Sequence, residues 1–584
     1  MSAPSPGQIL DQALDLLRKT PQGQEIAQMV LTLATAPQMP PSDQVRGLQA
    51  LVDLYPGHFA LQHDLASAML RAGQADVALA KLTDCLEQQP DYLPAKKNRV
   101  LCLLELGRFQ EAFDRLCDLN QEEPGAAAEF AEAVGTAELL CKGGPRTKRF
   151  ETAAAAFTSH LRTHPRSISA LSWAVQCHLL ANNPSGAEAV LCADNFERLG
   201  PDDRPVFLSM QNVLDWWKRV HEGDFGCPDM TRDGDRYVLP FAVWGNDYID
   251  AMQEFALPGF LSKGNLPEIA KRGEVHVLIM TIESDRARVE ALPLLDEVRR
   301  YATCSVLCLP ELVRQPSYRL MSLMHWTAVR YAQAQRAHLF SGSPDVVVTE
   351  NFLTALDDHR RRGADVVFVD AFLGEPAPVM QWYRQKVGES GRLLTVSPQE
   401  GVSLAARYPW SQLQLAVTEQ NGNRIRQDYP AVWPLASGGY VQICSRSSPS
   451  LMSCDALSRF DGALFLAHDT DFLEKILATP ESRSCCVVLG SHEGGAIELS
   501  RALSPNQPLI TPEKAAKAIG VLGTILLRPQ WVSDQPFDPR DPAFLKAEEF
   551  RRIMIGSITD DAAQDSPPWA QLWLNHPAKE CAAT

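Results

Sequence analysis

Two consecutive segments decide the fold of this chain: GHFALQHDLASAMLRAGQADVALAKLTDCLEQQP at residues 57–90 and DYLPAKKNRVLCLLELGRFQEAFDRLCDLNQEEP at residues 91–124. Pro56 precedes the first segment and a proline closes each one, so prolines recur every 34 residues. Each segment predicts a helix, a turn at Gly73 or Gly107, and a second helix that ends at the closing proline.

This period resembles that of the tetratricopeptide repeat (TPR), a pair of antiparallel helices. The positions at which the two helices of such a repeat pack are occupied by apolar or small residues, namely Leu65, Met69, Ala78, Leu82 and Cys85 in the first segment and Val100, Leu103, Ala112, Leu116 and Leu119 in the second. Looser copies at 22–56, 125–165 and 166–201 extend the array. The resemblance implies an all-α TPR solenoid over residues 22–201, whose concave groove holds a protein or peptide partner. An irregular helical bundle is the alternative.

Composition and charge restrict the partners. Hydrophobic residues make up 45% and charged residues 22% of the chain, as in ordinary globular proteins. The chain has 55 basic and 71 acidic side chains, and the resulting net charge of -16 disfavours nucleic acid as a partner. We find neither an apolar run long enough to span a membrane nor a secretory signal at the N-terminus, and none of the 14 cysteines forms a C-x-x-C pair. These features predict reduced thiols and a cytoplasmic location.

A second kind of architecture begins at about residue 237, where short apolar runs alternate with amphipathic segments. Strands are predicted at 237–244, 275–281, 305–309 and 366–370, and helices at 286–301 and 318–337. The predicted organisation is an N-terminal extension (1–21), the solenoid (22–201), a linker (202–236), an α/β domain with a mixed sheet (237–505), and a helical C-terminal extension with a tail (506–584). In such folds ligands bind beyond the carboxyl ends of the strands, so the loop TIESD at 281–285 is a candidate nucleotide site.

Residues 337–356, AHLFSGSPDVVVTENFLTAL, resemble the central strand and following turn of glycosyltransferases of the GT-A type. In that fold an Asp-x-Asp motif binds a divalent metal that neutralises the diphosphate of a nucleotide sugar. The resemblance implies that Asp345 binds Mg²⁺ or Mn²⁺ and faces the diphosphate. This chain departs from the motif because Val346 and Val347 follow Asp345.

A broader resemblance covers about 237–372 and continues more faintly to about 499. WGNDYI at 244–249, LPGFLSKGNLP at 257–267, MTIESD at 280–285, and Tyr318 with Met321 and His325 are similar to a bacterial glycosyltransferase-like domain that often follows TPRs. It implies a GT-A-like fold and sugar transfer from a nucleotide donor, with Thr281 and Asp285 lining the nucleotide pocket. His325 would then donate to a phosphate or a sugar hydroxyl.

Several of these residues also have a purely structural interpretation. The spacing of His325 with Tyr318 and Met321 is that of one helical stripe, which is more often core. Asp345 also suits a solvated turn. Trp244 and Asn265 suit sugar binding, but Asn265 is also an ordinary turn residue, and for both the structural role is favoured.

Asp469 and Asp471, in HDTDFL at 468–473, are the predicted acceptor-activating base or second metal ligand. The same acids equally suit the start of a helix. The run CCVVLGSHEGGAIELS at 485–500 lacks a phosphate-loop pattern, and a β-hairpin is the preferred interpretation.

The sequence therefore predicts a cytoplasmic, TPR-bearing, GT-A-like glycosyltransferase that moves a sugar from a nucleotide donor to a protein or glycan acceptor held by the repeats. Displacement at the anomeric carbon would release the nucleoside diphosphate. The alternative is a non-catalytic adaptor whose repeats assemble a complex, and the incomplete Asp motif favours it.

Overall fold

The computed structural model describes residues 6–20, 23–36, 39–106, 108, 111–112, 115, 119, 150–151, 153–155, 157–158, 161, 165–314, 317–369, 371–390, 396–409, 425–426, 431–436, 438–443, 448–465, 472–477, 486–488, 496–498, 509–510, 530–533 and 538–552. The chain divides into two compact units, 1–214 and 215–584. Each unit is described by itself.

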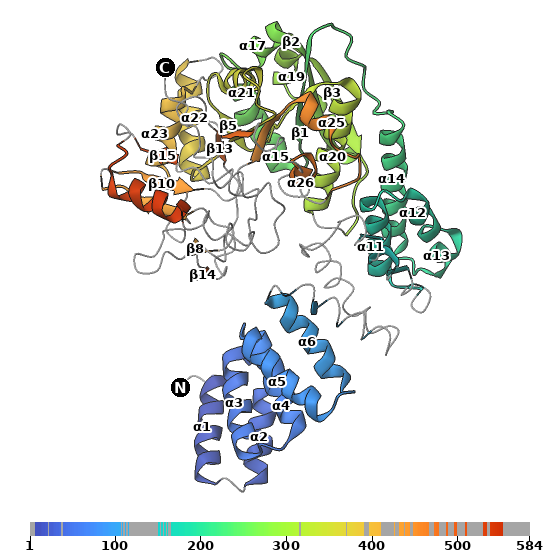
Figure 1. Cartoon of the computed structure of the whole chain (residues 1–584), viewed down its shortest axis with the longest axis vertical. Helices are drawn as coiled ribbons and strands as arrows, with labels where there is room; N and C mark the ends of the chain where they lie inside the picture. Colours follow the sequence, from blue (N-terminus) through green and yellow to red (C-terminus); the bar gives the residue numbers. More distant parts are fainter. Residues whose placement is uncertain are drawn as a thin grey trace, which may run out of the picture. The chain divides into compact units, whose positions relative to one another are not determined.

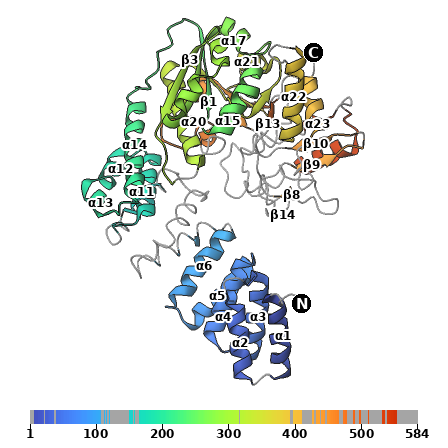
Figure 2. The same cartoon turned by 180° about the vertical axis from the view of Figure 1, so that it is seen from behind.

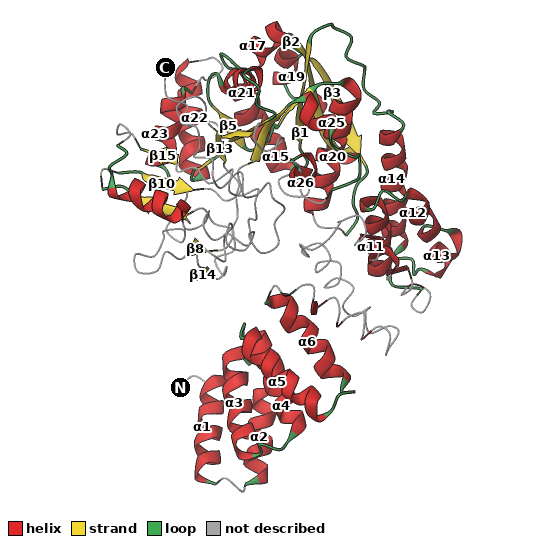
Figure 3. Ribbon diagram, viewed as in Figure 1, coloured by secondary structure: helices red, strands yellow, loops and turns green. Residues whose placement is uncertain are grey.

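The first unit is a helical solenoid (Figure 1). Its described helices are α1 (Pro6–Lys19), α2 (Gln24–Ala34), α3 (Pro41–Leu54), α4 (Phe59–Arg71), α5 (Ala75–Gln88), α6 (Leu93–Glu105), α11 (Ile168–Leu180), α12 (Pro184–Val190) and α13 (Ala193–Arg198), with the start of α14 (Arg204–His221). From α1 to α6 each helix packs against the next along the chain. Figure 3 shows that this unit contains helices and loops without strands in its described part.

The predicted repeat at 57–90 is confirmed. It forms α4 and α5, and Gly73 in the turn between them has a φ of 77°, which favours glycine. All five predicted packing residues of this repeat are buried, with Ala78 fully enclosed where the two helices meet. In the next repeat Val100, Leu103, Ala112 and Leu119 are likewise buried, while Leu116 and Gly107 lie outside the described residues.

Two segments that the sequence assigns outside the solenoid and the α/β domain are helical. In the expected extension 1–21, α1 shares the apolar core of the repeats through Leu10 and Leu14. About half of the expected linker 202–236 forms the helix α14. Apolar residues recur along this segment at helical spacing, which explains the helix. Its last turns belong to the second unit, where Trp216 Nε1 donates to Thr327 Oγ1 at 3.0 Å.

The second unit is built on a seven-stranded mixed sheet in the order β12-β6-β11-β4-β1-β2-β3. The strands are β1 (Asp235–Ala242), β2 (Gly273–Ile282), β3 (Thr303–Leu309), β4 (His338–Phe340), β6 (Val366–Val369), β11 (Ser448–Met452) and β12 (Cys486–Val488). β1, β2, β3 and β4 are parallel, as are β6 and β12, whereas β11 runs antiparallel to both of its neighbours.

Helices cover both faces of this sheet (Figure 1 and Figure 2). Successive side chains of β2 point to opposite faces of the sheet. On one face Val275 and Val277 join a core with residues of α17 and α21, and on the other face His276 contacts Tyr331 of α20. The helices are α15 (Asn246–Ala251), a π-helix (Met252–Ala256), α16 (Leu257–Phe260), α17 (Leu266–Arg272), a 3-10 turn (Glu283–Asp285), α18 (Arg286–Glu290), α19 (Leu294–Val298), α20 (Ser317–Gln335) and α21 (Phe352–Arg361). The single helix predicted at 286–301 is therefore wrong, because Pro293 separates α18 from α19.

The remaining described elements form smaller sheets and helices: β5 (Val346–Val348), β13 (Ala496–Glu498) and β7 (Phe372–Leu373) in one sheet, β15 (Gln530–Val532), β10 (Tyr440–Ile443) and β9 (Ala431–Pro434) in another, β14 (Leu509–Ile510) with β8 (Ile425–Arg426), and helices α22 (Pro376–Ser390), α23 (Pro398–Arg407), α25 (Cys454–Ser458) and α26 (Leu473–Ile476). β12 and β13 pair in different sheets, so the hairpin predicted at 485–500 is not formed. β14 and β15 extend strand structure beyond residue 505. None of the described helices has the length and apolar character that crossing a bilayer needs.

Candidate functional site

The carboxyl ends of three parallel strands meet at one edge of the large sheet. Ala242 at the end of β1 lies opposite Met280 of β2, and Phe241 forms a bridge with Gly342, which follows β4. The segments after these strands therefore begin side by side, as in other α/β folds that bind ligands at this edge. They contain the predicted residues Asp285 and Asp345.

Side-chain contacts join the segments after β1 and β2. Asp285 Oδ2 accepts a hydrogen bond from the backbone N–H of Gly245 at 2.7 Å, and the φ of 77° at Gly245 favours glycine there. Arg288 of α18 pairs with Asp250 of α15 at 2.6 Å and also donates to Asn246. Asp285 is half-buried, and in the described part of the chain its other carboxylate oxygen accepts no hydrogen bond. That oxygen remains available to a hydroxyl of a ligand.

An aromatic pair lies in the same segment. The rings of Trp244 and Tyr248 are 6.4 Å apart between centroids and tilted by 33°, and Tyr248 is 42% exposed. Trp244 is half-buried. Partly exposed aromatic faces of this kind can stack against a base or a sugar ring.

The other predicted site residues differ in their burial and in their hydrogen bonds. Thr281, at the end of β2, is fully buried, and its hydroxyl has no hydrogen-bond partner among the described residues. Asp345 is 9% exposed and accepts a hydrogen bond from Ser343. Asp469 and Asp471 lie outside the described residues.

His325 is half-buried on α20. Its predicted stripe is not the core face of that helix, because Met321 is 42% exposed while Leu320, Leu323 and Met324 are buried. The core interpretation is therefore wrong for Met321, and the role predicted for His325 stays a prediction.

Carboxylates, thiols and imidazoles do not gather into a metal site in the described part of the chain, where groups of three or more such residues with suitable geometry are absent. A Mg²⁺ or Mn²⁺ ion at Asp345 would therefore take its other ligands from the donor's diphosphate and from water, as Mg²⁺ commonly does beside one or two carboxylates.

Asn265 has the structural role that the sequence favoured. It is fully buried, and its amide nitrogen donates to Gly259 O, Ser262 Oγ and Thr349 O at 2.9 to 3.0 Å. Its amide oxygen accepts the backbone N–H of Leu353 at 2.8 Å. Asn265 thus caps the first turn of α21 and joins it to the segment before α17.

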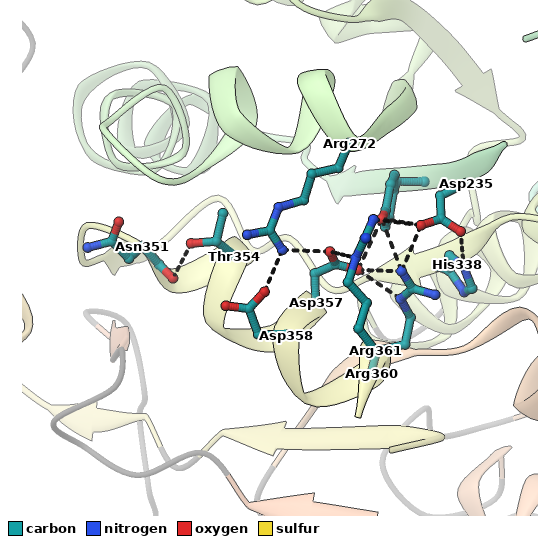
Figure 4. Close-up of polar contacts among 10 residues, drawn as sticks. Asp235, Arg272, His338, Asn351, Thr354, Asp357, Asp358, Arg360 and Arg361 are labelled. Atoms are coloured by element: carbon teal, nitrogen blue, oxygen red, sulfur yellow. Dashed lines mark hydrogen bonds and ion pairs between the residues drawn. The ribbon is translucent and has the colours of Figure 1, made fainter. Parts of the chain in front are cut away.

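At the opposite edge of the sheet the structure contains a charged cluster that the sequence did not reveal (Figure 4). Asp357 of α21 is fully buried and accepts hydrogen bonds from Arg272 at 2.8 Å, Arg360 at 2.8 Å, Arg361 at 2.8 Å and the Tyr237 hydroxyl at 3.0 Å. The cluster therefore ties α21 to α17 and to β1.

Asp235, at the start of β1, extends the cluster. It pairs with Arg360 at 2.9 Å and Arg361 at 2.8 Å, and His338 Nε2 lies 3.6 Å from its carboxylate. Burial would raise the pKa of Asp357, but the hydrogen bonds and charges of its arginines outweigh burial and hold that pKa below its usual value. Burial raises the pKa of Tyr237 to about 12, so this phenol stays protonated. The charge-dense run DDHRRR at 357–362 was the sequence signal for this cluster, because acids and arginines three or four residues apart share a helix face.

A pocket lies between α17 and α21, with a volume of about 440 Å³. Its lining is mostly polar and charged, and consists of Lys263, Gly264, Glu268, Arg272, Asn351, Thr354, Ala355, Asp358, His359 and Arg362. Asn351 has a left-handed φ of 61°, and its side chain lies against Gly264, where a Cβ would be 2.0 Å from Asn351 Oδ1. Sequence spacing did not predict this pocket, because it depends on how two helices far apart in the chain are placed.

A buried hydrogen-bond chain crosses the other face of the sheet. The Tyr331 hydroxyl donates to Pro228 O at 2.8 Å, so its oxygen accepts from His276 Nδ1, 2.6 Å away. His276 Nε2 then accepts from Ser305 Oγ at 2.9 Å. Burial lowers the pKa of His276 to about 4, so the imidazole is neutral and holds β2, β3 and α20 together.

Comparisons of the sequence with protein families and with curated proteins found no match. Among solved structures, the chain is similar to a MamA RS-1 ArsTM double mutant with 15% identity and a TM-score of 0.25, over 35% of this chain and 97% of that one. It is also similar to a mutant O-GlcNAc transferase from Thermobaculum terrenum, with 12% identity and a TM-score of 0.19 over 50% of each chain. A tetratricopeptide repeat protein from Parabacteroides merdae matches with 13% identity and a TM-score of 0.19, over 38% of this chain and 88% of that one. These TM-scores are low, and the solenoid is assigned from its own helices.

Proposed function

We propose that the α/β unit is a glycosyltransferase whose nucleotide-sugar donor binds at the carboxyl edge of the large sheet. The solenoid holds the protein or glycan acceptor. The observation that carries the proposal is the geometry of Asp285, which ties two strand-end segments together through one oxygen and leaves the other oxygen open. A carboxylate at this place can accept hydrogen bonds from ribose hydroxyls, as acids do in other nucleotide-binding α/β folds.

The neighbouring groups suit the rest of such a donor. Trp244 and Tyr248 offer aromatic faces beside Asp285 for a base or a sugar ring. Asp345 follows β4 at the same edge and is the residue proposed to face the diphosphate.

Transfer forms a bond from an acceptor oxygen to the anomeric carbon and breaks the bond from that carbon to the diphosphate oxygen. The acceptor proton passes to a base, for which Asp469 and Asp471 remain the candidates. A divalent metal held by Asp345 and the donor would supply neutralisation of the leaving diphosphate. Metal dependence is left to the assay.

The test measures thermal stabilisation and donor hydrolysis with a panel of uridine and guanosine sugar nucleotides, with and without Mn²⁺. A donor that binds is expected to stabilise the folded chain by about 2.7 kcal/mol at a hundredfold excess over its Kd. Two variants separate the roles of Asp285. Asp285→Asn keeps an oxygen for the Gly245 N–H and loses the charge, so donor affinity is expected to fall about fivefold, the difference between charged and neutral hydrogen bonds.

Asp285→Ala also removes the link to Gly245 and is expected to weaken the donor further. Asp296→Ala, at an aspartate of α19 that is 84% exposed, is the matched control and should behave as the native chain. The proposal is wrong if no donor stabilises or is hydrolysed, or if both Asp285 variants bind a donor as tightly as the control.

A second candidate function is a scaffold without catalysis, and one observation in the solenoid favours it. Asn98 of α6 donates to Ser67 of α4 at 2.8 Å and lies 3.2 Å from His63 Nε2, so polar side chains bridge the first helices of successive repeats. In solenoids such helices line the groove that holds partners. Failure of every donor in the panel, together with capture of a defined protein partner that Asn98→Ala weakens, would support the scaffold over the enzyme.

A further inference from the structure

The pocket between α17 and α21 is separate from the carboxyl-edge site, and the proposed function leaves it unexplained. The two helices are parallel neighbours on one face of the sheet, and each leads into a strand of that sheet. Lys263 precedes α17 and Arg272 ends it, so these two cations border opposite ends of the pocket. The six residue steps from Leu266 to Arg272 span about 9 Å of helix.

Both acids that line the pocket are already paired. Glu268 lies 2.6 Å from Lys271, and Asp358 lies 2.7 Å from Arg272. Their charges are therefore compensated within the protein.

The positively charged side chains that line the pocket are paired less completely than its two acids. In the described part of the chain the side chains of Lys263 and Arg362 have neither an ion pair nor a hydrogen bond, and both are exposed. The charge of Arg272 is paired with Asp357 and Asp358 through Nη1, but its Nε and Nη2 donate no hydrogen bond to the described residues. Lys263 and Arg362 thus give the pocket a positive surplus in a chain whose net charge is -16.

Three backbone N–H groups at the starts of the two helices are already used within the protein. At the start of α21 the N–H of Leu353 donates to Asn265 and that of Thr354 to Gly264 O, at 2.8 and 3.2 Å. At the start of α17 the N–H of Glu268 donates to Asn265 O at 2.9 Å. These three groups do not contribute to an anion site, and the charge that attracts an anion here comes from the side chains.

We propose that this pocket binds a small organic phosphate that carries a second anionic group. One anionic end contacts Lys263, and the other contacts Arg272 and Arg362. Asn351 and Thr354, which Figure 4 shows at the first turn of α21, lie at the Lys263 end, where their backbone N–H groups donate to Lys263 O and Gly264 O, and they offer neutral polar side chains to the ligand there. A volume of about 440 Å³ is within the range of pockets that hold small metabolites.

The experiment is calorimetric titration of the full chain with inorganic phosphate, fructose 1,6-bisphosphate and fructose as probes. The bisphosphate is expected to bind at least about tenfold more tightly than inorganic phosphate, since it reaches both ends, and fructose is expected not to bind. Affinity for the bisphosphate should also fall as salt is raised.

Two variants and a control test the location. Lys263→Gln and Arg362→Gln alter exposed side chains and leave the fold intact, and each is expected to weaken the bisphosphate about fivefold to tenfold. Arg300→Gln removes a cation that is 71% exposed and does not line the pocket, so it should leave the affinity unchanged. The proposal is overturned if the bisphosphate binds no better than phosphate, or if both pocket variants bind it as the Arg300 control does. Neither result bears on donor binding at Asp285.

Discussion

Replacing Asp357 by asparagine tests the buried charged cluster of the α/β unit. This carboxylate is fully buried and accepts hydrogen bonds from Arg272, Arg360, Arg361 and Tyr237. Asp357→Asn keeps the shape but removes the charge, and it turns one end of the side chain into a donor that faces other donors.

The expected cost follows from burial. Removing one partner of a buried ion pair leaves uncompensated charge and costs about 3 to 5 kcal/mol. This is a large part of the roughly 5 to 15 kcal/mol that stabilises a typical domain. Asp358→Asn is the matched control. The Asp358 side chain pairs with the same Arg272 but is 46% exposed. An exposed pair of this kind is worth about 0.2 to 1 kcal/mol.

Chemical denaturation of the full chain measures both variants, and amide hydrogen exchange in β1 and α21 assigns the loss to the α/β unit. The pKa of Asp357 is lowered in the folded state, so its contribution is present above the usual carboxyl pKa and is lost as the pH falls below it. If Asp357→Asn and Asp358→Asn cost the same amount, the buried charge of Asp357 stabilises the fold no more than an exposed ion pair does.

Three further predictions concern stability. The pKa of His276 is lowered to about 4, so the unfolded chain binds a proton first as the pH falls, and about 3 kcal/mol of stability should be lost between pH 6.5 and 4. Urea unfolding at several pH values should show a smaller slope in His276→Gln than in the native chain, and the slope that remains comes from other buried histidines such as His221 and His338. Gly264→Ala should cost more than about 2 kcal/mol, because a left-handed φ of 75° is combined with a Cβ placed 2.0 Å from a neighbouring asparagine oxygen. Gly363→Ala, with a φ of 101° and nothing within 4 Å, should show the smaller cost of the backbone alone in the same unfolding assay. In the solenoid, Ala78→Leu should cost about 1 to 3 kcal/mol by overpacking, whereas Val77→Leu at an exposed neighbour should stay within about 0.5 kcal/mol in thermal unfolding.

The repeats could be predicted from the sequence because their information is local. Each 34-residue unit contains its own helix-forming pattern, its turn glycine and its packing residues, and a unit contacts mainly its neighbours in the chain. The predicted positions from Leu65 to Cys85 are buried for this reason.

The strands of the α/β unit were predicted at nearly their observed places for a similar reason. The apolar runs at 237–244 and 275–281 correspond to β1 and β2, since a strand buried on both faces is apolar throughout. The hairpin expected at 485–500 is not formed, because β12 and β13 pair with strands more than a hundred residues away, in two different sheets. Strand pairing at that distance is not encoded in the local pattern.

The sequence by itself determined the helical repeats, the alternating elements of the second unit and the segments that follow its strands. Only the tertiary structure decided which side chains meet there: that Asp285 holds Gly245, that Asn265 is a buried cap, and that Asp357 is surrounded by arginines. The reason is physical. Local periodicity specifies which face of an element is buried, whereas hydrogen bonds and ion pairs between elements depend on distances of a few ångströms that packing of the whole unit sets.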